Sequence, residues 1–170
     1  ALELGGQWIG PTQEKMYALC QELGLETYPT YNEGDQIISL GGKTTRLKSG
    51  DNALCVLSKD VALEVTEVLE TLETMWRDLD LEAPYQHPRA MSWDSQTLAS
   101  WLEQNTCHPD TAAYLQLEIQ GLFAAEASEV SLLHVLFILK SGGGFYNLVS
   151  VKGGAQQDRI LGGSQRVSER

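Results

Sequence analysis

The sequence predicts an α+β protein in which helices predominate and the strands are short. Apolar residues recur at intervals of three and four over several stretches, which is the period of an amphipathic helix. Short strand-like runs flank glycine turns, which is typical of antiparallel hairpins. The sequence contains no internal repeat and no low-complexity segment.

The composition is that of a globular protein with an acidic surface. The 170 residues are 42% hydrophobic and 21% charged, which suffices for one domain with a real core. The formal net charge of −11 argues against nucleic acid as a partner, because phosphate binding needs a basic surface. No apolar run approaches the roughly 20 residues that cross a bilayer. We therefore expect no membrane segment in this chain.

Three cysteines, Cys20, Cys55 and Cys107, are far apart and form no CxxC or CxxH motif. We expect them to be reduced, which favours a cytoplasmic location. Residues 1–4 lack the basic region of a signal peptide. Because the chain does not start with methionine and its last residues fall inside a predicted helix, we expect a segment of a longer protein.

A glycine-rich stretch at residues 4–13 leads into the first predicted helix. It holds three glycines around Trp8, and backbone without Cβ atoms can closely approach another backbone or a flat ligand. Thr12 is a favourable N-cap residue, and the apolar spacing that follows predicts a helix that ends at Gly24. From the residue types alone, a plain loop is the simpler interpretation of residues 4–13.

A short strand and a hairpin are expected next. Residues 25–31 read as a strand, which Pro29 restricts to a sheet edge. A Gly-Gly pair separates two strand-like runs, 36–40 and 43–47. Such a pair between short strands is a good signal for a two-residue hairpin turn.

The clearest helix begins at Ser58, a good N-cap residue. One apolar stripe predicts its buried face, and acidic residues occupy the other faces. The stripe consists of Val61, Val65, Val68, Leu69, Leu72, Met75, Trp76 and Leu79.

Shorter helices are expected in the second half of the chain. Asp94 or Ser95 is expected to cap one of them, and Pro109 suits the first turn of the next. Ser128 is expected to cap a helix that stops at the glycines 142–144.

The last part of the chain alternates extended and glycine-rich segments. Residues 145–151 read as a strand. Glycine pairs at 153–154 and 162–163 form a second and a third glycine passage, and a last helix is expected from about Ser164.

Sequence motifs assign no catalytic residue and no metal ligand. The phosphate-binding motifs GxGxxG and GxxxxGKS/T are absent. The three histidines lie on different predicted elements without ligand spacing, and Ser164 lacks the GxSxG frame of a hydrolase nucleophile. No acid, base, nucleophile or metal site is therefore predicted from the residues themselves.

Two distant stretches together resemble the flavin-containing amine oxidases, the monoamine oxidase family. The first is LGGQWIGPTQ at 4–13, followed by ELGLET at 22–27. The second is AEASEVS at 125–131, followed by GGAQQDRILGGSQ at 153–165. Their order and spacing fit the family over almost the whole chain, whereas a single glycine motif would be a weak signal.

The resemblance implies a two-domain flavoenzyme of which this chain is mainly the substrate-binding domain. Residues 1–170 would form a single domain, in which an antiparallel sheet has helices packed on one side. Residues 1–13 and 153–170 would border the FAD domain, a Rossmann-like fold that is absent from this chain. FAD would be bound by the full-length parent and not by this chain alone.

The resemblance also implies two sets of site residues. The cofactor-binding set matches the family's stretch against the isoalloxazine ring and comprises Gly5, Gly6, Gln7 and Trp8. The substrate-binding set matches the wall of the substrate cavity and comprises Leu122, Phe123, Val149 and Gln156.

An enzyme of this kind oxidatively deaminates primary amines. A hydride equivalent passes from the amine α-carbon to FAD, and O2 is reduced to H2O2. The isolated chain would be inactive because it holds no dinucleotide site. Two alternatives stay open: a non-catalytic binding or interaction module, or a parent enzyme that acts on L-amino acids or polyamines. Recognition of an amino-acid carboxylate would require an arginine, for which the candidates are Arg46, Arg89 and Arg159.

The expected partners are a small amine substrate and the FAD domain of the same protein. A substrate domain separated from its FAD domain would expose apolar surface. Self-association of the isolated chain is therefore also expected.

Overall fold

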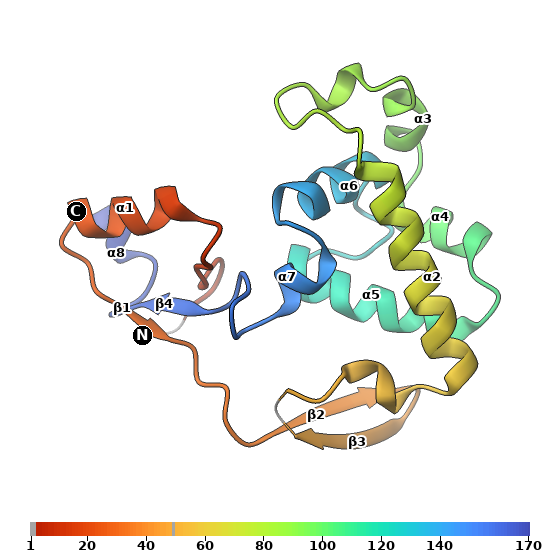
Figure 1. Cartoon of the computed structure of the whole chain (residues 1–170), viewed down its shortest axis with the longest axis horizontal. Coiled ribbons are helices and arrows are strands. Elements are labelled where there is room, and N and C mark those ends of the chain that lie inside the picture. Colours follow the sequence, from red (N-terminus) through yellow and green to blue (C-terminus); the bar gives the residue numbers. More distant parts are fainter. Residues whose placement is uncertain (1–2, 49) are drawn as a thin grey trace. The chain divides into compact units, whose positions relative to one another are not determined.

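The computed structural model describes residues 3–48 and 50–170, and the chain divides into two compact units. Unit 1 comprises Ala1–Asn32 and Gly142–Arg170, and unit 2 comprises Glu33–Ser141. Both units combine helices with an antiparallel pair of strands (Figure 1). The predicted α+β class is confirmed. The strands of the described residues form two separate two-stranded sheets rather than one larger sheet.

Unit 1 brings segments from the two ends of the chain together. Its sheet pairs β1 with β4, with Thr27 opposite Ile160 and Pro29 opposite Asp158. Ile9, Cys20 and Ile160 form its small buried core. The elements of unit 1 are α1 (Glu14–Glu22), β1 (Thr27–Pro29), α7 (Phe145–Val149), β4 (Asp158–Ile160) and α8 (Arg166–Glu169).

Unit 2 is a helical cluster with one hairpin. The long helix α2 packs against α5 and α6, and α4 also contacts both of these helices (Figure 1). The elements are β2 (Asp35–Leu40), β3 (Lys43–Lys48), η1 (Ala53–Val56), α2 (Lys59–Trp76), η2 (Pro84–Gln86), α3 (Ala90–Asp94), α4 (Leu98–Asn105), α5 (Pro109–Phe123) and α6 (Leu132–Ser141).

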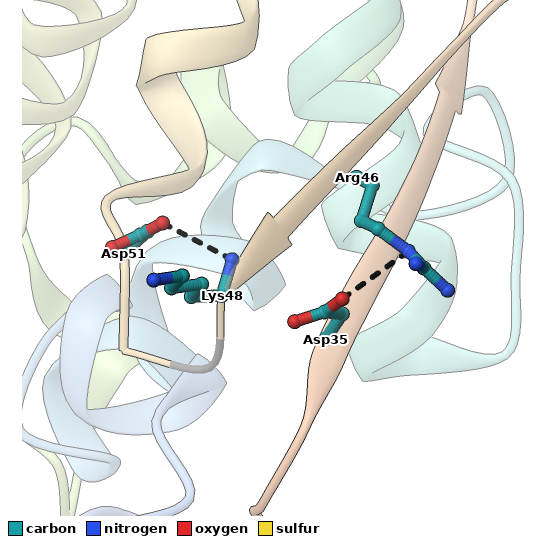
Figure 2. A network of polar contacts seen from close by, with 4 residues as sticks. All are labelled: Asp35, Arg46, Lys48 and Asp51. Atoms are coloured by element: carbon teal, nitrogen blue, oxygen red, sulfur yellow. Dashed lines mark hydrogen bonds and ion pairs between the residues drawn. The ribbon is translucent and has the colours of Figure 1, made fainter.

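The hairpin forms at the predicted glycine pair. Gly41 and Gly42 have φ values of 57° and 77°, and a two-residue turn with both φ positive matches the right-handed twist of the strands. On the exposed side of the hairpin, Arg46 Nε lies 3.2 Å from the Asp35 carboxylate (Figure 2). Figure 2 also shows the turn after β3, where the Lys48 backbone N–H donates to Asp51 Oδ2 at 3.1 Å.

Helix α2 is organised as the sequence predicts. The Ser58 side chain accepts a hydrogen bond from the backbone N–H of Val61, which satisfies one of the free donors at the helix start. Five residues of the predicted stripe are buried within the helix, and each stabilises the fold by roughly 1.5–3 kcal/mol. These residues are Val61, Val65, Val68, Leu69 and Leu72.

One side chain of α2 also caps the neighbouring helix α5. Glu64 accepts hydrogen bonds from the backbone N–H groups of Cys107 at 2.6 Å and His108 at 3.1 Å. The fully buried Thr111 hydroxyl donates to the same carboxylate at 2.5 Å. The bond from Thr111, followed by the two backbone bonds, lowers the pKa of Glu64 although desolvation opposes this.

Three predicted helix starts are wrong, because each helix begins at a later residue than its predicted cap indicates. Helix α1 begins at Glu14 rather than at Thr12, since a turn closed by the Gln13 N–H and the Gly10 carbonyl at 2.9 Å precedes it. Helix α4 is capped by Thr97, not by Asp94 or Ser95.

Helix α6 likewise begins at Leu132 rather than after Ser128. The Ser131 hydroxyl accepts a hydrogen bond from the His134 N–H at 3.2 Å. Ser128 and Ser131 are both good cap residues for α6. Ser131 lies directly before the helix and pairs with Thr97 in an isolated antiparallel bridge.

The strand expected at residues 145–151 is also wrong, because α7 occupies most of it. The Leu148 N–H donates to the Gly144 carbonyl at 3.2 Å, and the Asn147 amide donates to the Gly142 carbonyl at 2.6 Å. These local bonds favour a helical turn over the extended conformation.

Candidate functional site

The predicted cofactor-binding stretch lies in unit 1 and is open. Gly5 and Gly6 do not have positive φ, and no described atom lies within 4 Å of a Cβ built on either residue. Neither backbone conformation nor packing within the described residues therefore requires glycine at these two positions. Trp8 is 38% exposed and offers part of its indole ring to the same surface.

A groove runs along this stretch. It is an open hollow of about 690 Å³ that includes Gly6, Trp8, the start of α1 and the end of β4. Its exposed aromatic ring and its open glycine backbone suit a flat, partly apolar ligand. The residues that line it are Gly6, Trp8, Ile9, Thr12, Gln13, Glu14, Lys15, Met16, Ile160 and Ser164.

Gly10 is a glycine for a different reason. A Cβ at this position would lie 2.4 Å from the Ala155 Cα and 2.6 Å from the Gly154 carbonyl oxygen. The glycine-rich stretch at residues 4–13 and the second glycine passage at 153–154 therefore pack backbone against backbone. Next to this contact, Ile9 and Asp158 exchange two backbone hydrogen bonds of 2.8 Å each.

Tyr17 and Asp158 form a polar contact behind the glycine stretch. The Tyr17 hydroxyl donates to Asp158 Oδ2 at 2.5 Å and also lies 3.4 Å from the Ile9 carbonyl oxygen. Desolvation, with smaller contributions from the hydrogen bond and the negative charge of Asp158, raises the pKa of Tyr17 to about 12. The phenol therefore acts as a donor at neutral pH.

The third glycine passage, at Gly162 and Gly163, lies next to Glu3. Gly162 and Gly163 have φ values of 88° and 97°, which only glycine adopts readily. Glu3 accepts a hydrogen bond from the Ser164 backbone N–H at 2.8 Å. Glu3 and Ser164, which are 161 residues apart, are thus linked within unit 1.

The predicted substrate-binding residues are divided between the units. Val149 and Gln156 belong to unit 1, where both are partly buried. The Gln156 side-chain amide donates to the Leu148 carbonyl at 3.1 Å, which brings it to the end of α7 next to Val149. The roles of Val149 and Gln156 stay predictions.

Leu122 and Phe123 lie at the end of α5 in unit 2 and are also partly buried. The helix ends at Ala124, whose φ of 51° is left-handed. The ring of Phe123 meets His134 edge-on, with 5.7 Å between ring centroids. The substrate roles of Leu122 and Phe123 stay predictions.

A carboxylate that sequence reasoning passed over lies on the same helix. Glu118 is seven residues after Thr111 and four before Leu122, so these residues share one helix face. Glu118 is partly buried, and desolvation raises its pKa although a hydrogen bond with Tyr114 opposes this. Neither ion pair found among the described residues includes it.

The three candidate arginines differ in their surroundings. Arg46 is paired with Asp35 on the exposed side of the hairpin (Figure 2). Arg89 precedes α3 and lines a separate groove of unit 2. The Nε of Arg159 is buried without a hydrogen-bond partner among the described residues.

Two further classes of site are absent from the described part of the chain. Within residues 3–48 and 50–170, no group of three or more histidine, cysteine, aspartate or glutamate side chains could hold a metal ion. No helix in the same ranges has the length and apolar character needed to cross a membrane.

The chain as a whole matches one protein family. Residues 1–170 match the family described as flavin containing amine oxidoreductase. The chain therefore belongs to this family of flavoprotein oxidoreductases, and the predicted resemblance is confirmed.

Curated relatives of the family include monoamine oxidases. The chain is 34% identical to the probable flavin-containing monoamine oxidase A of Dictyostelium discoideum, over 98% of this chain and 36% of the relative. It is 33% identical to human flavin-containing amine oxidase B, over 99% of this chain and 32% of that protein. The chain thus spans about a third of the length of these relatives.

Solved structures of amine oxidases share its fold. A putrescine oxidase bound to putrescine superimposes with a TM-score of 0.85 and 28% identity, over 99% of this chain and 37% of that one. Cyclohexylamine oxidase from Brevibacterium oxydans IH-35A gives a TM-score of 0.85 and 26% identity, with the same coverage of 99% and 37%.

Proposed function

We propose that the protein to which this chain belongs is an FAD-dependent oxidase of primary amines. The observation that carries the proposal is the open glycine pair Gly5–Gly6 beside the exposed ring of Trp8. These glycines have no explanation within the described chain, whereas contact with a flat ring explains them. Membership of the flavin containing amine oxidoreductase family supports a flavin as that ring.

The glycine-rich stretch and the groove beside it suit a flavin. Gly5 and Gly6 leave open the space that a Cβ would take, and Trp8 offers an aromatic surface with one N–H donor. In this proposal Gly5, Gly6, Gln7 and Trp8 would hold the ring. When bound, FAD would supply the redox chemistry, in which the amine α-carbon loses a hydride equivalent and O2 becomes H2O2.

The chain's own residues would bind and orient the amine. Leu122, Phe123 and Val149 would contribute apolar surface that excludes water, and the Gln156 amide is held by the Leu148 carbonyl. No side chain is proposed as an acid, base or nucleophile. Orientation of the substrate and a dry surface are the contributions assigned to this chain.

We also propose that the chain is mainly the substrate-binding domain of the parent. Both segments expected to border the FAD domain, 1–13 and 153–170, lie in unit 1, which supports this division. On this basis the isolated chain binds no FAD, has no oxidase activity and associates with itself. A cytoplasmic location stays a prediction.

The full-length protein tests the main proposal. Purified full-length protein should be yellow with a flavin absorbance spectrum, and it should release H2O2 with primary amines. A panel of monoamines, diamines and L-amino acids would identify the substrate class. A colourless full-length protein that releases no H2O2 would favour the non-catalytic interaction module instead.

One observation favours diamines or polyamines as a second candidate substrate class. Glu118 places a partly buried carboxylate, without a cationic partner in the described chain, one helical turn from Leu122. A carboxylate next to an apolar surface suits the distal ammonium group of a diamine. The structurally similar putrescine oxidase was solved with putrescine bound.

The variant Glu118→Gln tests this candidate. It should raise KM for a diamine about tenfold or more and leave KM for a monoamine of similar length unchanged. Glu103→Gln, on the exposed surface of α4, is the matched control and should change neither value. Equal effects of Glu118→Gln on both substrates would remove the diamine interpretation.

A further inference from the structure

The Tyr17 hydroxyl joins three separate segments of unit 1. It is carried by α1, it donates to Asp158 of β4 at 2.5 Å, and it lies 3.4 Å from the carbonyl of Ile9. Tyr17 and Asp158 are 141 residues apart in the sequence, so the contact depends on the tertiary fold.

Ile9 lies at the centre of the glycine-rich stretch. It is 3% exposed, and both of its backbone polar groups pair with Asp158 at 2.8 Å. Asp158 therefore holds this stretch through its backbone and meets Tyr17 through its side chain. Gly10, which follows directly, packs against the backbone of residues 154–155.

A second side chain reinforces the position of the Asp158 carboxylate. The side-chain N–H of Gln157 donates to the same oxygen, Asp158 Oδ2, at 3.1 Å. The side-chain oxygen of Gln157, Oε1, accepts from the Gly153 N–H at 3.1 Å. The first and second glycine passages are thus connected by one polar network. A partly buried carboxylate with two donors has its position fixed by hydrogen bonds as well as by packing.

We propose that Tyr17 and Asp158 are positioning residues that hold residues 5–10 in the conformation that receives the flavin ring. The inference rests on the proposed function, because it assigns the open glycines Gly5 and Gly6 to flavin contact. Neither side chain is proposed to touch the flavin. They act through Ile9, which both contact and which lies one residue from Trp8.

The hydroxyl group of Tyr17 is the informative part of this residue. Its ring packs against the small core formed by Ile9, Cys20 and Ile160, and a phenylalanine would preserve that packing. The hydroxyl adds only the polar contacts to Asp158 and Ile9. Removing it therefore separates positioning of the glycine stretch from filling of the core.

The variant Tyr17→Phe in the full-length protein tests the proposal. We expect its dissociation constant for FAD, measured by dialysis and fluorescence, to rise about tenfold, which corresponds to one lost hydrogen bond to a charged acceptor. We also expect a shifted visible absorbance band for the flavin that remains bound. Thermal unfolding of the FAD-free variant reports any loss of folding separately.

Tyr28→Phe is the matched control. Tyr28 lies on β1 of the same sheet, is 40% exposed and pairs in register with Arg159 rather than with Asp158. The variant Tyr28→Phe removes a phenolic hydroxyl from the same unit and leaves the hydrogen bonds of Asp158 unchanged. Its FAD affinity and flavin spectrum should equal those of the unchanged protein.

Two changes at Asp158 complete the test. Asp158→Asn retains an oxygen that can accept from Tyr17 and should keep most of the FAD affinity, whereas Asp158→Ala should resemble Tyr17→Phe. Because Asp158→Ala already removes the acceptor of the Tyr17 hydroxyl, the double variant Tyr17→Phe with Asp158→Ala should weaken FAD binding no more than Asp158→Ala alone.

The outcomes distinguish this inference from the proposed function. If the full-length protein binds FAD and Tyr17→Phe leaves its affinity and spectrum unchanged, the positioning role is overturned and the amine oxidase assignment stands. A lower unfolding temperature with an unchanged flavin spectrum also overturns it, since the pair would then only stabilise the fold. If the full-length protein binds no FAD, both the proposed function and the inference are overturned.

Discussion

Gly10 and Gly5 are glycines for different physical reasons. Gly10 faces the backbone of Gly154 and Ala155, where a Cβ would lie 2.4 Å from the nearest atom. Gly5 faces open space in the described chain. The same residue type thus serves internal packing at one position and, in our proposal, access for a ligand at the other.

The variant Gly10→Ala should destabilise the protein by about 1–3 kcal/mol, because the added methyl group has to displace backbone. Gly5→Ala should change stability by less than about 0.5 kcal/mol. Denaturant unfolding of the full-length protein, followed by a probe in unit 1, measures both values. Equal stability of the two variants would contradict the close backbone packing at Gly10.

Tyr17 should also give a distinctive alkaline titration. Its pKa is raised from 10.0 to about 12 in the folded state, so the folded state holds the phenolic proton more tightly than the unfolded state. The resulting stability is fully present below pH 10 and is lost as the pH rises through about 12. The difference in tyrosinate absorbance between the protein and Tyr17→Phe measures this titration; a midpoint at 10 would contradict both the burial of the phenol and its contact with Asp158.

At the scale of elements, the contact between α2 and α5 depends on the carboxylate of Glu64. It accepts hydrogen bonds from the backbone N–H groups of Cys107 and His108, directly before α5, and from the buried Thr111. A neutral amide would keep one acceptor oxygen and lose the charge. Glu64 therefore adds polar contacts to the packing of α2 against α5.

Glu64→Gln should lower stability by about 1–3 kcal/mol at neutral pH. Because the folded pKa of Glu64 lies below its ordinary value of 4.5, the contribution is present above that value and is lost as the pH falls through the folded pKa. The two proteins should therefore converge in stability in acid. Glu67→Gln, on the exposed side of α2, is the control, and an equal effect there would contradict the capping role.

Local signals predicted the hairpin and the start of α2. The hairpin at Gly41 and Gly42 and the cap at Ser58 follow from backbone conformation and from one side chain. Residues 145–151 are predicted to be a strand, but Phe145–Val149 form a helical turn held by Asn147 and the preceding glycines. Competing cap residues such as Ser128 and Ser131 could not be ranked without the packing around them.

At the scale of the whole chain, the glycine stretch and its resemblance to flavin enzymes could be read from the sequence. The close contact of Gly10 with Gly154 and the pair Tyr17–Asp158 could not, because each joins residues more than 140 positions apart. Glu118 could have been noticed as an acidic residue on the helix face of Thr111 and Leu122. The roles of Gly5, Gly6, Gln7 and Trp8 stay predictions.

The central claim is that the open glycines receive a flavin, and the FAD affinity of Gly6→Ala in the full-length protein tests it most directly. No described atom lies within 4 Å of the added methyl group, so the fold should tolerate it. The control is Gly121→Ala, which also faces open space but lies in α5 of unit 2. We predict at least about tenfold weaker FAD binding for Gly6→Ala, with unchanged unfolding of the FAD-free protein. FAD affinity and flavin spectra that are identical in Gly6→Ala, Gly121→Ala and the unchanged protein would contradict the account.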